Sequence, residues 1–327
     1  MNGFSFLFIA ALVLMTAVEL WLSLRQSRHV SAHRDKVPDA FKEQISIEEH
    51  QKAANYTVAK GKLNRLDGVF GMVVLLLWTF GGGLAVLSGF WQSFGWSDMT
   101  AGVVFILSFF ILSSVIDLPF SWYRTFVLEA EFGFNKSSVG LFFSDLIKQT
   151  ILMVLIGAPL LWGALWLMDS TGEYWWLYLW AAWIGFTLLM MWAYPAFIAP
   201  LFNQFSPLED VALKARVEGL LSRCGFKSQG IFVMDGSRRS GHGNAYFTGL
   251  GSNKRIVFFD TLLKTLNEEQ IEAVLAHELG HFRRKHVLKN MGVMAVLSLV
   301  SLALLGWVIT EPWFYAGLGV TTQSSAM

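Results

Sequence analysis

The amino-acid sequence predicts a mainly α-helical protein that crosses a membrane several times and carries one small α+β domain. Hydrophobic residues make up 54% of the 327 residues and charged residues only 15%, whereas a soluble domain usually carries about a quarter charged residues. Six apolar runs are each long enough to cross about 30 Å of hydrocarbon. All 25 lysines and arginines lie in three segments between these runs.

The six apolar runs are expected to form six transmembrane helices. The first has no basic residue before it, is too long for a signal-peptide core and continues into Arg25 without a small-residue cleavage site. We therefore interpret it as a retained span. The expected spans are Phe4–Leu24, Gly68–Trp91, Met99–Trp122, Ile151–Met168, Trp175–Phe197 and Met291–Thr310.

The lysines and arginines predict the orientation of these spans. Residues 25–66, 123–148 and 198–289 hold nine, three and thirteen of the 25, and the N-terminus and the other loops hold none. Because cytoplasmic loops carry an excess of lysine and arginine, these three segments are expected in the cytoplasm and the N-terminus outside. The compact loops favour a bacterial inner membrane as the location.

Charge and cysteine content exclude two classes of protein. A net charge of +1 argues against a nucleic-acid partner, which requires a concentrated basic face. The single cysteine, Cys224, cannot form an internal disulfide and fits a reducing compartment. We expect it to be a small buried apolar residue.

The large cytoplasmic segment 198–289 predicts the small α+β domain. Its last helix is expected to begin at an Asn267 cap, with Gln270 at the capping-box position, and to end at the basic residues Arg283–Lys285. A five-residue turn, Gly249–Asn253, separates two of the expected strands and indicates a hairpin. The other expected elements are a helix over Pro207–Cys224 and strands over Ile231–Met234, Ala245–Thr248 and Ile256–Phe259.

The last cytoplasmic helix carries the pattern His277-Glu278-Leu279-Gly280-His281. Histidines four residues apart project from one helix face and can bind one zinc ion. Glu278 lies beside them, where it can accept a proton from a water molecule that attacks a peptide carbonyl. This pattern predicts a zinc-dependent peptidase with His277 and His281 as metal ligands and Glu278 as the catalytic base.

A catalytic zinc site needs a third protein ligand. His286 follows His277 by nine residues, about 900° of turn on a continuous helix, which places it on the opposite face. We therefore expect His286 at the surface or the membrane interface. The only acidic residue after His281 is Glu311, which the topology places across the membrane. The third ligand is thus either an acidic residue earlier in the chain or a residue outside this chain.

Several further motifs accompany the histidine pattern. They are Tyr56-Thr57-Val58-Ala59-Lys60, Asp117-Leu118-Pro119-Phe120, Phe132-Gly133-Phe134-Asn135-Lys136, Ile198-Ala199-Pro200-Leu201-Phe202-Asn203, Asn244-Ala245-Tyr246-Phe247 and Lys254-Arg255-Ile256-Val257. With these motifs in this order, the chain resembles the type I CAAX prenyl protease family. These membrane zinc endopeptidases, with a gluzincin-type protease domain, remove the last three residues of prenylated proteins.

The resemblance implies a bundle of seven transmembrane helices around a water-filled chamber. It implies one zinc ion on His277 and His281, with Glu278 as the base, and a substrate-binding edge strand at Asn244–Phe247. The family's third zinc ligand is a glutamate in a segment that would follow residue 327. The chain is therefore expected to be a C-terminally incomplete member, inactive as written if that glutamate is missing.

These expectations divide the chain into a membrane domain over residues 1–203 and a metallopeptidase domain over residues 204–327. The expected partners are a peptide or protein substrate, prenylated or otherwise membrane-associated, and the lipid bilayer, with no nucleic acid. An intramembrane site-2 protease is disfavoured, because charged residues flank the histidine pattern here. The alternative function is a non-proteolytic membrane scaffold or quality-control factor with a degenerate metal site.

Overall fold

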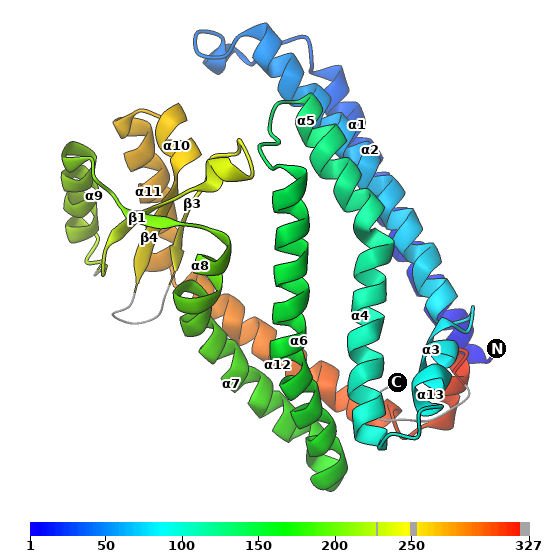
Figure 1. The fold of residues 1–327 in the computed structure, drawn as a ribbon. Helices are drawn as coiled ribbons and strands as arrows, with labels where there is room; N and C mark the ends of the chain where they lie inside the picture. Colours follow the sequence, from blue (N-terminus) through cyan, green and yellow to red (C-terminus); the bar gives the residue numbers. More distant parts are fainter. Residues whose placement is uncertain (227, 249–253, 321–327) are drawn as a thin grey trace. The chain divides into compact units, whose positions relative to one another are not determined.

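The computed structural model describes residues 1–226, 228–248 and 254–320, which form two compact units. The first unit comprises Met1–Phe132, Thr150–Asp169 and the chain from Trp307 onward. The second unit comprises Gly133–Gln149 and Ser170–Gly306. Each unit therefore draws on segments that are far apart in the sequence, and Figure 1 names their helices and strands.

Long apolar helices dominate the structure, as the sequence predicts. Among the described residues, five helices are long and apolar enough to span a membrane, or six when one bent pair counts as a span. The helices of the first unit, with α6 shared between the units, are α1 (Gly3–Ala32), α2 (Ile47–Trp78), α3 (Gly83–Gln92), α4 (Asp98–Tyr123), a π-helical turn (Arg124–Leu128), α5 (Glu129–Glu131), α6 (Val139–Ser170) and α13 (Pro312–Gly317).

The second expected span, Gly68–Trp91, is a bent pair rather than one straight helix. Helices α2 and α3 meet at an angle of 50°. A Cβ atom at Gly81 would lie 2.5 Å from the Leu77 carbonyl oxygen, and Gly82 has a φ of 78°. Only glycine adopts such positions without strain, so the glycines that follow α2 fix the bend.

The second unit contains the predicted α+β domain. Its sheet has the strand order β1-β2-β4-β3; β1 and β2 are antiparallel, β2 and β4 parallel, and β4 and β3 antiparallel. Its elements are α7 (Trp175–Ala193), a π-helical turn (Tyr194–Ile198), α8 (Ala199–Phe202), β1 (Phe205–Pro207), α9 (Val211–Arg223), β2 (Ile231–Met234), β3 (Ala245–Thr248), β4 (Arg255–Phe259), α10 (Asp260–Thr265), α11 (Glu268–Arg283) and α12 (His286–Val308).

The three predicted strands are confirmed as β2, β3 and β4, and the sequence missed β1. That strand has three residues and ends in Pro207, so it lacks both the length and the composition of a typical strand. The expected hairpin turn at Gly249–Asn253 lies outside the described residues. The expectation of a buried Cys224 is wrong: this residue follows the last turn of α9 and is exposed.

One face of the sheet forms the main hydrophobic core. Ile256 and Phe258 of β4 are 1% and 0% exposed and pack with Val217 of α9 and Leu275 of α11. Figure 1 shows α9 and α11 beside the sheet. Since successive side chains of a strand point to opposite faces, the intervening residue Val257 faces the other side of the sheet.

Helix α12 is fixed against α7 within the second unit. The indole N–H of Trp180 donates to the carbonyl of Ala295 at 2.9 Å. A Cβ atom at Gly306 would lie 2.8 Å from the Trp176 ring, so this glycine allows close approach of the two helices. The helix that follows α11 is therefore held along the neighbouring span.

Candidate functional site

Helix α11 carries the predicted catalytic residues, and its sequence fixes where it begins. The Gln270 amide donates to Asn267 Oδ1 at 2.9 Å, and the Asn267 amide donates to Gln270 Oε1 at 3.0 Å. This reciprocal pair is the expected capping box. Ile271, Leu275 and Leu279 lie four residues apart and are 1–3% exposed against the sheet, so the helix cannot rotate without exposing this stripe.

The two histidines of the pattern lie together on the exposed side of α11. Their Nε2 atoms are 3.2 Å apart, and both side chains are exposed. Two imidazole nitrogens bound to one tetrahedral zinc ion, each at about 2.0–2.1 Å, would be about 3.3 Å apart. His277 and His281 therefore fit one ion through their Nε2 atoms.

A complete set of three metal donors is not present among the described residues. No group of three histidine, cysteine, aspartate or glutamate side chains that could hold a metal occurs within the described parts of the chain. Glu278 is partly buried next to the histidines. Among the described residues, His277 and His281 are thus candidates for two of the three protein donors that a catalytic zinc site needs.

The structure corrects the expected position of His286. Helix α11 ends at Arg283, and Lys285 has a left-handed φ of 55°. The helix is not continuous, so the rotation expected from nine residues of helix does not apply. The His286 Nδ1 atom instead lies 2.9 Å from His281 Nδ1, next to the predicted metal ligand.

Strand β3, the predicted substrate-binding strand, lies at an edge of the sheet. The amide of Phe259 donates to the carbonyl of Asn244 at 2.9 Å, and in an antiparallel pair the residues that bond the neighbouring strand alternate. Tyr246 therefore bonds β4, whereas the backbone groups of Ala245 and Phe247 point away from it. The Asn244 Oδ1 atom already accepts from the Ala245 amide at 2.8 Å. The Ala245 amide at this edge is therefore already hydrogen-bonded within the protein.

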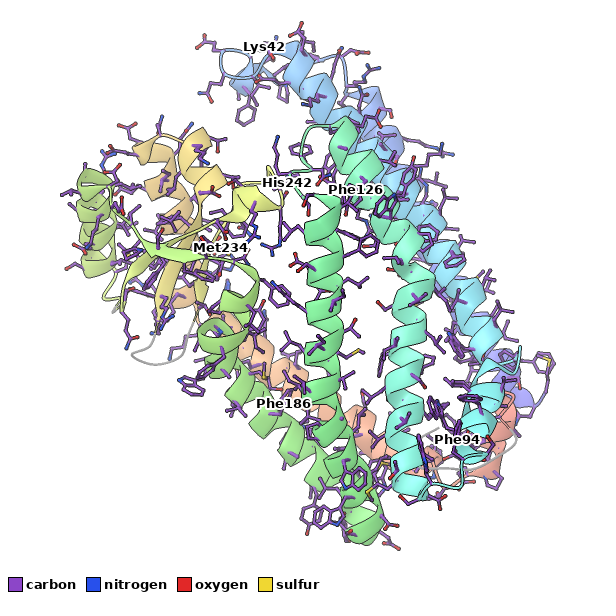
Figure 2. All side chains as sticks on the ribbon, viewed as in Figure 1. Lys42, Phe94, Phe126, Phe186, Met234 and His242 are labelled. Carbon is purple, nitrogen blue, oxygen red and sulfur yellow. The ribbon has the colours of Figure 1, made fainter. Side chains whose placement is uncertain are left out.

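The loop before β3 packs against the segment before α6. The Gly241 amide donates to the Phe134 carbonyl at 2.8 Å, and Asn135 forms an antiparallel bridge with Ser240. The His242 ring stacks on Phe134 with ring centroids 4.2 Å apart, and Figure 2 shows His242 on this loop. Two of the sequence motifs, around Asn135 and around Asn244, are therefore neighbours in space.

Arg239 joins this loop to two further segments. Its Nε and Nη2 atoms donate to the two oxygens of Asp145 at 2.7 and 3.0 Å, and its Nη1 atom donates to Asn203 Oδ1 at 2.9 Å. The side chains of Arg239 and Asp145 are only 24% and 14% exposed. A bidentate pair of this kind has a defined geometry, so Arg239 fixes the loop that leads into β3.

The sequence did not indicate the role of Arg239 or Asp145. An aspartate in the apolar run Leu141–Ile147 is a signal that could have pointed to a partner, because a carboxylate in such surroundings needs one. No local pattern, however, identifies the partner ninety-four residues away.

A cavity of about 530 Å³ lies on the other face of the sheet, within the second unit. Burial and the neighbouring Tyr194 raise the pKa of Tyr246, one of the residues that line this cavity. The lining residues are Tyr194, Pro195, Ala199, Pro200, Asn203, Gln204, Phe205, Phe232, Tyr246, Thr248, Arg255 and Val257. The sheet thus separates this cavity from the core beneath α11.

Comparisons with known proteins agree with the fold and the motifs. The family described as "CAAX prenyl protease N-terminal, five membrane helices" matches residues 26–204, and "Peptidase family M48" matches residues 207–318. A CAAX prenyl protease 1 homolog of Dictyostelium discoideum is 34% identical over 94% of this chain and 73% of its own length. A homolog of Arabidopsis thaliana is 33% identical over 96% of this chain and 76% of its own.

A solved structure is similar over almost the whole chain. The crystal structure of S. mikatae Ste24p matches with a TM-score of 0.91 and 32% identity, over 99% of this chain and 77% of that chain. The matched relatives that are named by organism are eukaryotic. The expected bacterial inner membrane therefore has no support from them, whereas the multi-pass membrane location does.

Proposed function

Because this chain belongs to the CAAX prenyl protease family of M48 metallopeptidases, we propose that it is a zinc-dependent endopeptidase of membrane-associated proteins. Its substrates are peptide segments near the C-terminus of prenylated or otherwise membrane-bound proteins. The protease domain lies on the cytoplasmic side, since all lysines and arginines of the chain lie in the three segments assigned there. The observation that carries the proposal is the 3.2 Å distance between the Nε2 atoms of His277 and His281, beside Glu278.

The residues of α11 would divide the reaction between them. His277 and His281 would hold zinc, which supplies a Lewis acid to polarise the scissile carbonyl. Glu278 would accept a proton from the attacking water and return it to the leaving amine nitrogen. We propose that the third protein donor, a glutamate by the family resemblance, comes from outside the described residues.

Strand β3 would hold the substrate through backbone hydrogen bonds. An extended peptide that adds to an exposed sheet edge is bound largely without reading its sequence. The available groups belong to Ala245 and Phe247, which alternate with the residues bonded to β4. Asn244 would have to release the Ala245 amide before that position could pair with substrate.

Zinc content and cleavage test the catalytic part of this proposal. The protein expressed from its full gene is purified and assayed for zinc stoichiometry and for cleavage of a farnesylated peptide and its unprenylated counterpart. We expect His277→Ala to lose both zinc and cleavage. A full gene product that binds no zinc and cleaves neither peptide would contradict the protease assignment and favour a non-proteolytic scaffold.

A scan of N-methylated peptides tests the substrate strand. N-methylation removes one backbone donor at a time along the same peptide. Because an added strand bonds its neighbour only at alternate residues, we expect KM to rise at every second position near the scissile bond. Equal sensitivity at consecutive positions would contradict binding along β3.

A further inference from the structure

The imidazole of His281 has a second histidine neighbour that the proposed mechanism does not use. One ring nitrogen of His281, Nε2, lies 3.2 Å from His277 Nε2, and the other, Nδ1, lies 2.9 Å from His286 Nδ1. The rings of His281 and His286 are nearly perpendicular, at 80°, with centroids 4.9 Å apart. Both nitrogens of His281 are therefore engaged by named partners.

The backbone places His286 at this position through a defined turn. Lys285 has a φ of 55° and is the only described residue other than glycine with a positive φ. The left-handed conformation is strained for a residue that carries a side chain, so surrounding interactions must hold it. Helix α12 begins at His286 and is anchored to α7 by Trp180, which keeps the turn in place.

The chemistry of imidazole assigns the proton in this contact. A neutral imidazole carries one N–H and one lone pair, on different nitrogens. If His281 Nε2 gives its lone pair to zinc, its Nδ1 carries the hydrogen and donates to His286 Nδ1, which must then accept.

We propose that His286 is a positioning residue that fixes the tautomer and the ring orientation of the zinc ligand His281. This inference rests on the proposed zinc site. Partners of this kind orient metal-binding histidines and raise their basicity. His286 acts through His281 and is not itself a ligand, because its Nδ1 faces the Nδ1 of His281 rather than the pair of Nε2 atoms.

Three variants of His286 separate this role from others. In His286→Asn the side-chain amide oxygen can take the place of the accepting Nδ1. In His286→Gln the amide lies one carbon farther from the backbone, and in His286→Ala the acceptor is removed. His33→Asn is the matched control, since His33 Nδ1 lies 2.9 Å from the His29 carbonyl in the last turn of α1. Zinc dissociation constants are measured on the full gene product by chelator competition, and the visible spectrum of the cobalt-substituted protein reports the ligand geometry.

We expect His286→Ala and His286→Gln to raise the zinc dissociation constant about 10–100-fold and to shift the cobalt spectrum, as loss of a ligand's hydrogen-bond partner does elsewhere. His286→Asn and the control should stay close to the unchanged protein in both measurements. Unchanged zinc affinity and spectrum in all three variants would overturn the proposal. Loss of stoichiometric zinc in all three would overturn it too, because His286 would then be a ligand.

The same experiment separates this inference from the proposed function. Glu278→Gln is expected to bind zinc and to cleave peptide at least about 100-fold more slowly. If this variant cleaves at the unchanged rate, the assigned base is wrong, and the role of His286 is then tested by zinc affinity alone. If the unchanged full gene product binds no zinc, both proposals fail together.

Discussion

Helix α11 and strand β3 belong to the same unit but are specified in opposite ways. The capping box, the buried stripe and the paired histidines of α11 all lie within Asn267–Arg283. Strand β3 has four residues, and the loop that leads into it is held by Asp145 and Asn203, which are 94 and 36 residues from Arg239. The proposed catalytic residues thus lie within one short segment of the sequence. The proposed substrate-binding strand is held in place by residues from distant segments.

The largest expected effect comes from removing the proposed base on α11, Glu278. Glu278→Gln should lower kcat by about 10²–10⁴-fold, the usual contribution of a positioned acid or base, with zinc binding and KM little changed. Steady-state peptide cleavage and metal analysis measure this.

Glu272→Gln is the matched control, because Glu272 lies on the same helix but pairs with Arg223 at 2.8 Å. A comparable loss of kcat in this control would show that charge on α11, rather than the position of Glu278, matters.

The second-largest effect is expected from Arg239→Met, which should weaken substrate binding without changing zinc binding. Arg239→Met leaves the partly buried Asp145 carboxylate without its bidentate partner. We expect a loss of about 2–3 kcal/mol in the free energy of unfolding and a raised KM, with unchanged zinc affinity. Denaturant unfolding, kinetics and chelator competition report the three quantities.

Arg238→Met serves as the control, since Arg238 is the exposed neighbour of Arg239. If Arg239→Met weakens zinc binding as much as substrate binding, the separation of the two regions is wrong.

A smaller effect is expected from filling space in the loop before β3. A Cβ atom at the buried Gly236 would lie 2.6 Å from the Phe259 ring, so Gly236→Ala should destabilise the protein by about 1–3 kcal/mol. Gly219→Ala on α9 meets nothing within 4 Å and should stabilise by about 0.5–1 kcal/mol. Thermal unfolding compares the pair, and equal melting temperatures would contradict the close packing of this loop.

The smallest effect concerns acid stability at the same loop. Burial alone would raise the pKa of Asp260, but hydrogen bonds from the backbone and hydroxyl of Ser237, with Lys264 nearby, outweigh it and lower the pKa below its ordinary value of 3.8. A lowered pKa adds stability above the ordinary value that is lost as pH falls below it. The stability difference between the unchanged protein and Asp260→Asn should therefore shrink between about pH 5 and pH 3. A difference that is constant with pH would contradict the assignment.

The sequence by itself determined the features that depend on neighbouring residues. Apolar length predicted the spans, short β-branched or aromatic runs predicted β2, β3 and β4, and the Asn267–Gln270 pair predicted the start of α11. The spacing of His277 and His281 predicted their shared face, because a helix repeats every 3.6 residues whatever surrounds it. Each of these patterns is complete within one element.

Only the tertiary structure decided the features that depend on where a chain turns. A single left-handed residue, Lys285, follows the end of α11 and brings His286 next to His281, the predicted metal ligand. Arg239 found its partner on α6 through folding that no local pattern encodes. A small change in one backbone angle redirects everything after it, so the sequence could propose catalytic residues but could not identify the residues that contact them.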